Sequence, residues 1–300
     1  MIRVYQSKKI KPDHKNVVYM NAFCEGLDNL GIEYEKSFIE DGYIKSDAIA
    51  LFGWKKGKPT DGPSQANLRT QLIEAHDDPS STYVMERGYI KRDSYYSIGI
   101  GGFNGIADFK NSNSDDKRWL QLDQKLGETN WEDNKLVLVC GQVLNDASLR
   151  GINYAAWVYR TIKYIMDYGA GAGGRGYDVE IAFRYHPLYK NRETMPLPIP
   201  NAKKLILDTD ESFTDLLNRC RYTVSFNSNI GVESILAGVP TISFDERSMV
   251  WNISSHDAGQ PYMPTLEERK QWAFDLAYSQ WTLEEIKAGL PHRHLKIYND

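Results

Sequence analysis

The sequence has few cysteines, no long apolar run and no strong excess of charge of either sign. Its three cysteines, Cys24, Cys140 and Cys220, form no CxxC pair and no even set for disulfides, which predicts a protein of the reducing cytoplasm. It lacks the long apolar stretch of a membrane span and the apolar core of a signal peptide, so we expect no transmembrane segment. A formal net charge of -4 argues against a dedicated nucleic-acid coat protein.

The hydrophobic pattern describes a globular protein with two α/β domains. The chain has 300 residues, 41% hydrophobic and 25% charged, which is the length of about two domains and too apolar for long disorder. Strands are predicted at 2–6, 48–54, 81–86, 135–140, 179–185, 204–207, 222–226 and 239–244, and helices at 16–30, 64–76, 154–168, 212–220, 231–237 and 266–288. This alternation predicts parallel sheets covered on both faces, and hence two Rossmann-like domains facing each other across a cleft.

The domain boundaries follow from changes in composition. The stretch 110–134 is polar and is interpreted as an inter-domain linker, so an N-terminal domain with its linker covers 1–134. A second domain covers 135–265, and a helical, aromatic-rich tail covers 266–300. The glycine-rich stretch 95–109 is interpreted as a functional loop or a bent strand rather than a regular element.

Polar residues follow four apolar strands of the second domain. Ligands of open α/β sheets bind beyond the carboxyl ends of the strands, so these residues are expected to share one edge. They are Gln142 after the first strand, His186 after the second, Asn227 and Ser228 after the next, and Asp245 after the last. One such residue is ordinary loop chemistry, but four at one edge predict a binding site.

The segment after Phe226 has the features of a phosphate site. Asn227 and Ser228 are good helix N-caps, and Gly231 leaves space for a ligand to approach the first helical turn. The N–H groups and dipole of a helix N-terminus bind phosphate, and Glu233 in the first turn is placed to bond a ribose diol. The alternative is that Ser228 only caps the helix and Glu233 only complements its dipole.

Arg184 and His186 share one face of their strand, because strand side chains alternate. A guanidinium and an imidazole both suit a diphosphate or a nucleoside monophosphate. The alternative is that His186, which precedes Pro187, only closes a turn.

Two motifs of the second domain have counterparts in a known family. Arg184-Tyr185-His186-Pro187, and Ser225-Phe226-Asn227-Ser228 with Gly231, Glu233 and Gly238-Val239-Pro240, resemble the C-terminal nucleotide-sugar domain of GT-B glycosyltransferases. The likeness is greatest to the capsular-polysaccharide Kdo-transferase type and related sialyltransferases, whose HP motif and serine-containing motif hold the nucleotide phosphate. The segment from Gly141 to Ser148 also resembles the one that opens their second domain. The resemblance covers roughly Ser81 to Gly289 and implies that the C-terminal helix crosses back to the first domain.

Glycosyl transfer also requires a carboxylate that acts as a base or nucleophile near the anomeric carbon. Asp146 follows the first strand of the second domain, within the segment that resembles the family, although it could equally be a helix N-cap. Glu86 ends a strand of the first domain, although it could equally pair with Arg87 or Arg92. Asp108 is a weaker candidate.

One basic and aromatic loop is a candidate for acceptor binding. Trp54, Lys55, Lys56 and Lys58 follow a strand of the first domain and could contact an anionic acceptor, either nucleic-acid phosphates or an acidic glycan. The alternative is a solvated turn. No histidine pair or cysteine cluster has metal-ligand spacing, and His292-Arg293-His294 is interpreted as a solvated tail. We therefore expect no metal, and no cofactor besides a nucleotide-sugar co-substrate.

Together these observations predict a glycosyltransferase that moves a sugar from a nucleotide-activated donor to a hydroxyl acceptor. The acceptor is either a hydroxymethylated pyrimidine in phage-type DNA or a cell-surface polysaccharide, in the cytosol of a bacterium or a phage-infected host. Two alternatives remain open: a nucleotide-sugar epimerase on the same fold, and a non-catalytic nucleotide-sugar-binding protein. The donor sugar, the nucleotide, the stereochemical outcome and the oligomeric state do not follow from the sequence.

Overall fold

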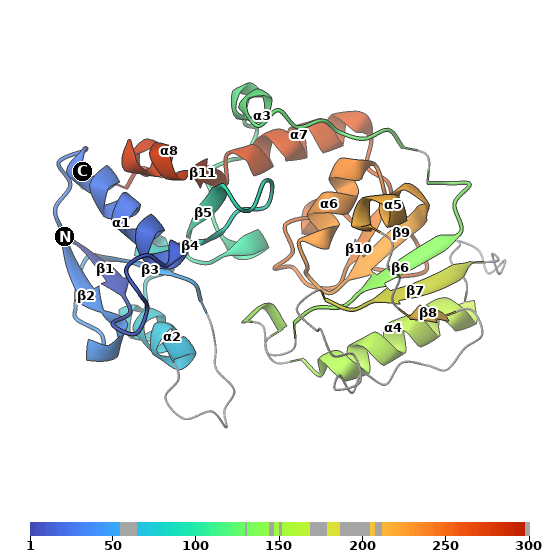
Figure 1. Cartoon of the computed structure of the whole chain (residues 1–300), viewed down its shortest axis with the longest axis horizontal. Helices are drawn as coiled ribbons and strands as arrows, with labels where there is room; N and C mark the ends of the chain where they lie inside the picture. Colours follow the sequence, from blue (N-terminus) through green and yellow to red (C-terminus); the bar gives the residue numbers. More distant parts are fainter. Residues whose placement is uncertain are drawn as a thin grey trace. The chain divides into compact units, whose positions relative to one another are not determined.

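A computed structural model of the chain describes residues 1–54, 65–129, 131–143, 147–149, 152–168, 179–186, 205–207 and 212–297. The chain forms two compact units, and the first is built from both ends of the sequence (Figure 1). This first unit comprises Met1–Leu122 and Phe274–Asp300, and the second comprises Asp123–Ala273. The C-terminal residues therefore return to the first unit, as the GT-B resemblance implies.

The first unit contains a sheet with strand order β11-β5-β4-β3-β1-β2. Its elements are β1 (Ile2–Gln6), α1 (Lys15–Asp28), β2 (Tyr34–Phe38), β3 (Ala48–Phe52), α2 (Gln65–His76), β4 (Thr82–Arg87), β5 (Tyr95–Ile100), α3 (Lys117–Gln121), β11 (Gln280–Thr282), α8 (Leu283–Lys287) and α9 (Leu290–His294). Strands β2, β1, β3 and β4 are parallel, whereas β5 is antiparallel to both β4 and β11. The expectation of an all-parallel sheet was therefore wrong for this unit.

The first part of the glycine-rich stretch, Tyr95–Ile100, forms a regular strand, and the rest, 101–109, is irregular as a loop would be. In β5, Tyr96 and Ile98 alternate into the hydrophobic core, while Gly99 is buried against the chain that follows. A Cβ on Gly99 would lie 2.5 Å from the Cβ of Ala107, so glycine is required there by packing. Strand β2 was not anticipated, because its residues YEKSF lie at the sheet edge, are mostly exposed and show little apolar pattern.

The C-terminal segment contains a strand as well as the expected helix. Helix α7 (Leu266–Ala277) ends well before the predicted residue 288, and β11 then adds an edge to the first sheet. The buried Gln280 side chain fixes this strand, since its Oε1 accepts hydrogen bonds from the backbone N–H groups of Tyr89 (2.7 Å) and Ile90 (2.9 Å). Thr282 then starts α8 with a capping box.

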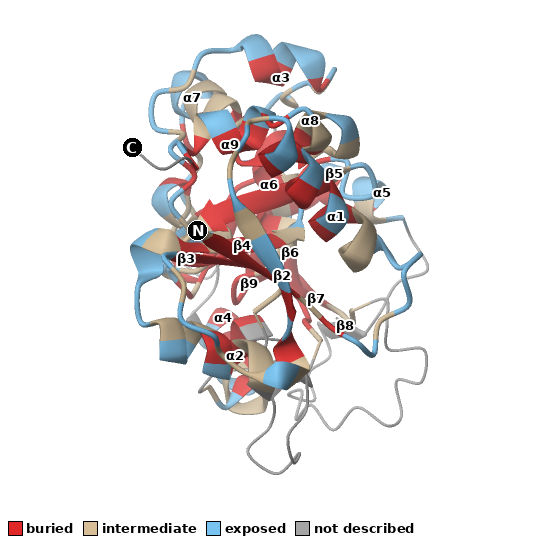
Figure 2. Ribbon diagram, turned by 90° about the vertical axis from the view of Figure 1, so that its left-hand side faces the viewer, coloured by how far each residue is buried: buried red, intermediate tan, exposed pale blue. Residues whose placement is uncertain are grey.

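His292 is fully buried in the first unit, which corrects the interpretation of 292–294 as a solvated tail. The central strand β3 of the same unit is also buried along its length (Figure 2). Its Nε2 lies 3.0 Å from the carbonyl oxygen of Phe23, and its ring packs 4.4 Å from the Phe23 ring. His294 also bonds a carbonyl, with Nε2 2.9 Å from the oxygen of Phe109. Burial lowers the pKa of His292 to about 4.

We expect the first unit to lose stability in mild acid. His292 has a pKa lowered from 6.5 to about 4, so the unfolded chain binds more protons within that range and the contribution present above pH 6.5 is lost toward pH 4. The free energy of unfolding should fall by about 2 kcal/mol between pH 8 and pH 5 from this group. Urea unfolding at both pH values measures the loss. The His292→Gln variant, which cannot titrate, should show a smaller loss, and an equal loss would contradict the assignment.

The second unit contains an entirely parallel sheet with strand order β10-β9-β6-β7-β8. Its elements are β6 (Leu136–Cys140), α4 (Tyr154–Tyr168), β7 (Glu180–Arg184), β8 (Leu205–Leu207), α5 (Phe213–Asn218), β9 (Cys220–Ser225), α6 (Ile230–Ala237) and β10 (Thr241–Ser243). Helix α4 covers one face of the sheet, and α5 and α6 cover the other (Figure 1). Because every strand runs in the same direction, all the carboxyl ends lie at one edge.

Candidate functional site

The carboxyl edge of the second sheet gathers the residues that follow its strands. Gln142 follows β6, His186 follows β7, Asn227 and Ser228 follow β9, and Asp245 follows β10. Strands β10, β9, β6 and β7 are consecutive neighbours, so these residues extend along one continuous edge. The topology therefore places together the residues that the sequence grouped by pattern.

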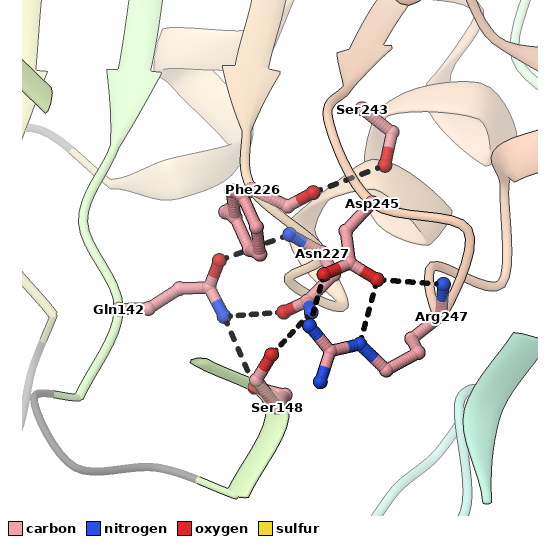
Figure 3. Close-up of polar contacts among 7 residues, drawn as sticks. All are labelled: Gln142, Ser148, Phe226, Asn227, Ser243, Asp245 and Arg247. Carbon is pink, nitrogen blue, oxygen red and sulfur yellow. Dashed lines mark hydrogen bonds and ion pairs between the residues drawn. The ribbon is translucent and has the colours of Figure 1, made fainter. Parts of the chain in front are cut away.

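Gln142 and Asn227 form a buried amide pair at the centre of this edge (Figure 3). The Gln142 Nε2 donates to Asn227 Oδ1 at 2.8 Å, and the Asn227 backbone N–H donates to Gln142 Oε1 at 3.0 Å. Ser148 joins the pair, because Asn227 Nδ2 donates to its carbonyl oxygen at 2.7 Å and Gln142 Nε2 lies 3.4 Å from its hydroxyl. The Tyr154 hydroxyl also accepts from the Gln142 N–H at 2.8 Å.

The amide side chains of Gln142 and Asn227 therefore have a structural role. Gln142 is 6% exposed and Asn227 is 5% exposed, and their side-chain oxygens and nitrogens bond to protein groups. The loops after β6 and β9 are thereby held to each other and to the short 3-10 turn at Ala147–Leu149. The network fixes the shape of the strand ends and leaves ligand contact to neighbouring residues.

Helix α6 begins one residue earlier than the sequence indicated, and its cap differs from the expected one. Asn229 is the N-cap and makes no side-chain cap bond; its Nδ2 instead lies 3.2 Å from Glu233 Oε1. The half-buried Ser228 lies just before the helix, where its carbonyl accepts from the Gly231 N–H at 3.1 Å. A Cβ on Gly231 would lie 2.7 Å from Val250 Cγ2, so packing alone already explains this glycine.

Arg184 and His186 occupy the end of β7, and both are half-buried. The Arg184 guanidinium lies 5.4 Å from the centre of the Phe213 ring. The backbone at this point approaches β6 closely, because the Gly141 N–H donates to the Arg184 carbonyl at 2.8 Å. A guanidinium and an imidazole thus stand at the end of β7, beside the strand that Gln142 follows.

Asp245 is neutralised by an arginine of its own loop (Figure 3). Arg247 donates from Nε to Asp245 Oδ1 at 2.7 Å and from its backbone N–H to the same oxygen at 2.8 Å, and its Nη2 bonds Oδ2. The hydrogen bond to Asp245 raises the pKa of Arg247. Asp245 therefore stabilises the loop that follows β10.

The candidate carboxylate Glu86 lies in the first unit. Glu86 is half-buried on β4, and its Oε1 comes close to the end of β3, since a Cβ on Gly53 would lie 3.4 Å from it. Burial lowers the pKa of Arg69, while the charges of Glu86 and Glu40 oppose that shift. Arg87 makes an ion pair with Asp93 at 2.8 Å.

Trp54 follows β3 and is half-buried, with its ring 6.0 Å from that of Phe103. The other candidates, Asp146, Lys55, Lys56 and Lys58, lie outside the described residues. Asp108 pairs with Lys110 at the surface.

Sequence reasoning missed the residues that hold the edge together. Ser148 and Tyr154 bond Gln142, and Arg247 bonds Asp245. Of the three, only Ser148 lies in a segment that the family resemblance covers by motif, and no pattern distinguishes the other two from ordinary helix or loop residues. Within the described residues, no three His, Cys, Asp or Glu side chains converge as ligands for a metal ion. In the same part of the chain, no helix has the length and apolar character to cross a bilayer.

Comparison with known proteins identifies the fold. No family model and no curated protein matches the chain. The solved structure of KpsC β-Kdo 2,4-transferase from Thermosulfurimonas dismutans aligns with a TM-score of 0.56 and 15% identity over 93% of this chain and 92% of that one. KpsC β-Kdo 2,7-transferase from the same organism has a TM-score of 0.49 and 14% identity over 96% and 98%.

UDP-GlcNAc 2-epimerase from Methanocaldococcus jannaschii, in complex with UDP-GlcNAc and UDP, has a TM-score of 0.28 and 8% identity over 90% and 97%. The likeness to the 2,4-transferase confirms the expected α/β, GT-B-like fold with two Rossmann-like domains.

Proposed function

We propose that this GT-B-like protein is a glycosyltransferase that moves a sugar from a nucleotide-activated donor to a hydroxyl acceptor. The observation that carries the proposal is the single carboxyl edge where Arg184, His186 and Ser228 lie beside a rigid amide network and the start of α6. Ligands of open parallel sheets bind at this edge, and helix N-termini favour phosphate. The fold shared with a β-Kdo 2,4-transferase agrees with this function.

The donor site is proposed to divide into contacting and positioning residues. Arg184, His186 and Ser228 have half-buried side chains, which suits contact with the donor phosphate, and Glu233 in the first turn of α6 suits a ribose hydroxyl. Gln142 and Asn227 hold the loops in place through their mutual bonds, and Gly231 lets α6 pack against Val250. No metal and no further cofactor are part of this proposal.

The catalytic carboxylate is proposed to be Asp146, with Glu86 as the competing candidate. Asp146 stands between Gln142 and Ser148 in sequence, and those two residues are bonded to Asn227 at the carboxyl edge. Glu86 stands at the corresponding edge of the first sheet, at the end of β4. A carboxylate at either position would deprotonate the acceptor or attack the anomeric carbon.

The acceptor is proposed to be a hydroxymethylated pyrimidine of phage-type DNA or a cell-surface polysaccharide, with Trp54, Lys55, Lys56 and Lys58 as candidate contacts. Incubation of the full chain with labelled UDP-, CMP- and GDP-sugars tests the proposal, with hydroxymethylated DNA, an acidic glycan or no acceptor. Label on DNA or on glycan supports a transferase and identifies its acceptor. An isomerised donor would show an epimerase, and no turnover of any donor would favour a binding protein.

His186→Ala and Ser228→Ala should each weaken donor binding by about 1–3 kcal/mol, because each removes a hydrogen bond to a charged phosphate. Both side chains are half-buried at the ends of strands, so the fold should survive. Calorimetry with the donor measures the change. Lys163→Gln, on the exposed side of α4, is the control and should bind normally. Unchanged donor affinity in both variants would remove the phosphate assignment.

A further inference from the structure

A separate cavity of about 810 Å³ lies on the α4 face of the second sheet. Its walls come from α4 with the residues just before it and from the chain after β10, including Trp157, Tyr164, Phe244 and His256. This volume is typical of sites for small organic ligands, and the walls are more apolar than polar. Among the described residues that line the cavity, none is proposed to contact the donor, so the cavity is distinct from the proposed phosphate site.

The cavity nevertheless adjoins the carboxyl edge. The Trp157 ring packs edge-on against Phe226, with centroids 5.5 Å apart, and against Phe244, at 5.6 Å. Phe226 immediately precedes Asn227 of the amide pair, and its carbonyl accepts from the Phe244 N–H at 3.0 Å. The aromatic wall of the cavity therefore continues to the residue that precedes the amide pair at the carboxyl edge.

One wall of the cavity offers a cation. Arg160 is exposed on α4 and makes no ion pair or hydrogen bond with any residue that the structure describes. Lys163, on the same helix, is instead engaged with Asp167 at 2.7 Å. The Arg160 guanidinium is therefore free to take an anionic group of a ligand, and guanidinium is well suited to phosphate.

The opposite wall offers hydrogen-bond acceptors. His256 Nδ1 lies 3.0 Å from the Ser243 carbonyl oxygen, so Nδ1 donates to that oxygen. The imidazole is stacked on Trp251 with centroids 3.4 Å apart, which fixes its plane. Asp257 takes hydrogen bonds from the Gly259 N–H (2.8 Å) and the Tyr164 hydroxyl (3.3 Å) on Oδ1. Among the described residues, its Oδ2 has no partner.

We propose that this cavity is an acceptor subsite that takes one nucleotide, with its base against the aromatic walls and its phosphate on Arg160. Aromatic rings stack on bases, and a carboxylate such as Asp257 accepts from the exocyclic amino group of cytosine. The subsite thus favours a hydroxymethylated cytosine over a hydroxymethylated uracil. This inference rests on the proposed function, since it chooses the nucleic-acid acceptor over the polysaccharide.

Calorimetry with 5-hydroxymethyl-dCMP and the full chain tests the subsite. Arg160→Gln should weaken binding about tenfold or more, since it removes a charge-assisted bond, whereas Lys163→Gln should bind like the parent protein. Tyr164→Leu removes a ring from the wall and should weaken binding, whereas Tyr159→Leu, which alters an exposed ring outside the cavity, should not. If Arg160→Gln binds normally, the proposal is overturned.

Two ligand comparisons test recognition of the base. Deoxyribose 5-phosphate, which has no base, should bind at least tenfold more weakly than 5-hydroxymethyl-dCMP, and 5-hydroxymethyl-dUMP should bind several-fold more weakly because it lacks the amino donor. Equal affinity for the phosphate without a base would show an anion site only, and would overturn the proposal.

A pair of variants separates this subsite from the donor site. Ser228→Ala should leave binding of 5-hydroxymethyl-dCMP unchanged, and Arg160→Gln should leave donor affinity unchanged. If Ser228→Ala weakens the monophosphate instead, the nucleotide occupies the donor site and the inference fails. If the protein turns over a donor but Arg160→Gln binds 5-hydroxymethyl-dCMP as tightly as the parent protein, the subsite is refuted and the transferase is not. Arg160-dependent binding without any donor turnover would refute the transferase and keep the nucleotide site.

Discussion

Replacing Asp146 by asparagine is expected to lower turnover about a hundredfold or more while donor affinity changes little. A base or nucleophile acts mainly in the transition state, so its loss affects kcat more than binding. Asparagine keeps the size of the side chain and caps helices as well as aspartate does. A residue that only caps would therefore leave activity nearly normal. Steady-state kinetics with the donor identified by labelling, together with calorimetry, measures both quantities.

Glu86→Gln is the matched comparison for Asp146→Asn. Both substitutions replace a carboxylate by its amide, and Glu86 stands in the other unit at the end of β4. We expect Glu86→Gln to retain most of the activity. Normal turnover of Asp146→Asn with an inactive Glu86→Gln would assign the catalytic group to the first unit and show that the preference for Asp146 was wrong.

Arg118→Met is expected to destabilise the first unit by about 3–5 kcal/mol, the cost of breaking a buried ion pair from one side. Arg118 is 8% exposed and bonds the Glu285 carboxylate at 2.8 Å and 3.2 Å. It also donates to the carbonyl oxygens of Ala277 (3.1 Å) and Gln280 (2.7 Å), and stacks 3.8 Å from the Trp281 ring. The substitution removes the guanidinium donor from the Glu285 carboxylate and from both carbonyl oxygens, and the cation from the Trp281 ring.

The pKa of Glu285 also indicates that its carboxylate depends on Arg118. Burial acts to raise it, but hydrogen bonds from Arg118 and Thr282 outweigh burial and hold it below its usual range. Urea unfolding measures the loss of stability in Arg118→Met. Lys117→Met removes a neighbouring charge that pairs with Asp115 at the surface, and it should leave the stability nearly unchanged. Similar losses in the two variants would contradict the role of Arg118.

The second unit was more predictable from the sequence than the first, for a physical reason. Buried parallel strands such as β6, with the residues LVLVC, are continuous apolar runs, so both their positions and the residues at their carboxyl ends can be identified. In the first unit, β2 and β11 are edge strands and carry little apolar signal. The antiparallel β5 was obscured by its glycines, which packing requires.

In the candidate site, the grouping of the residues could be predicted from the sequence, whereas the contacts between their side chains could not. The grouping of Gln142, His186 and Asn227 followed from topology, because parallel strands deliver their following residues to one edge. The engagement of Gln142 with Asn227 could not be predicted, because it depends on loop conformations that bring together side chains 85 residues apart. The same applies to His292, whose burial depends on contacts with α1 from the other end of the sequence.

The insertion of the second unit between the two parts of the first has a consequence for the order of folding during synthesis. The second unit is one continuous segment, so it can fold as soon as it leaves the ribosome. The first unit cannot complete its fold at that stage, because β11 and α8 are translated after the second unit. The partners of Arg118 follow that residue by 159 to 167 positions. Until then, β5 lacks its partner strand β11, and α1 lacks the packing of α8. We therefore expect chaperones to bind the first 122 residues for longer during synthesis than the second unit.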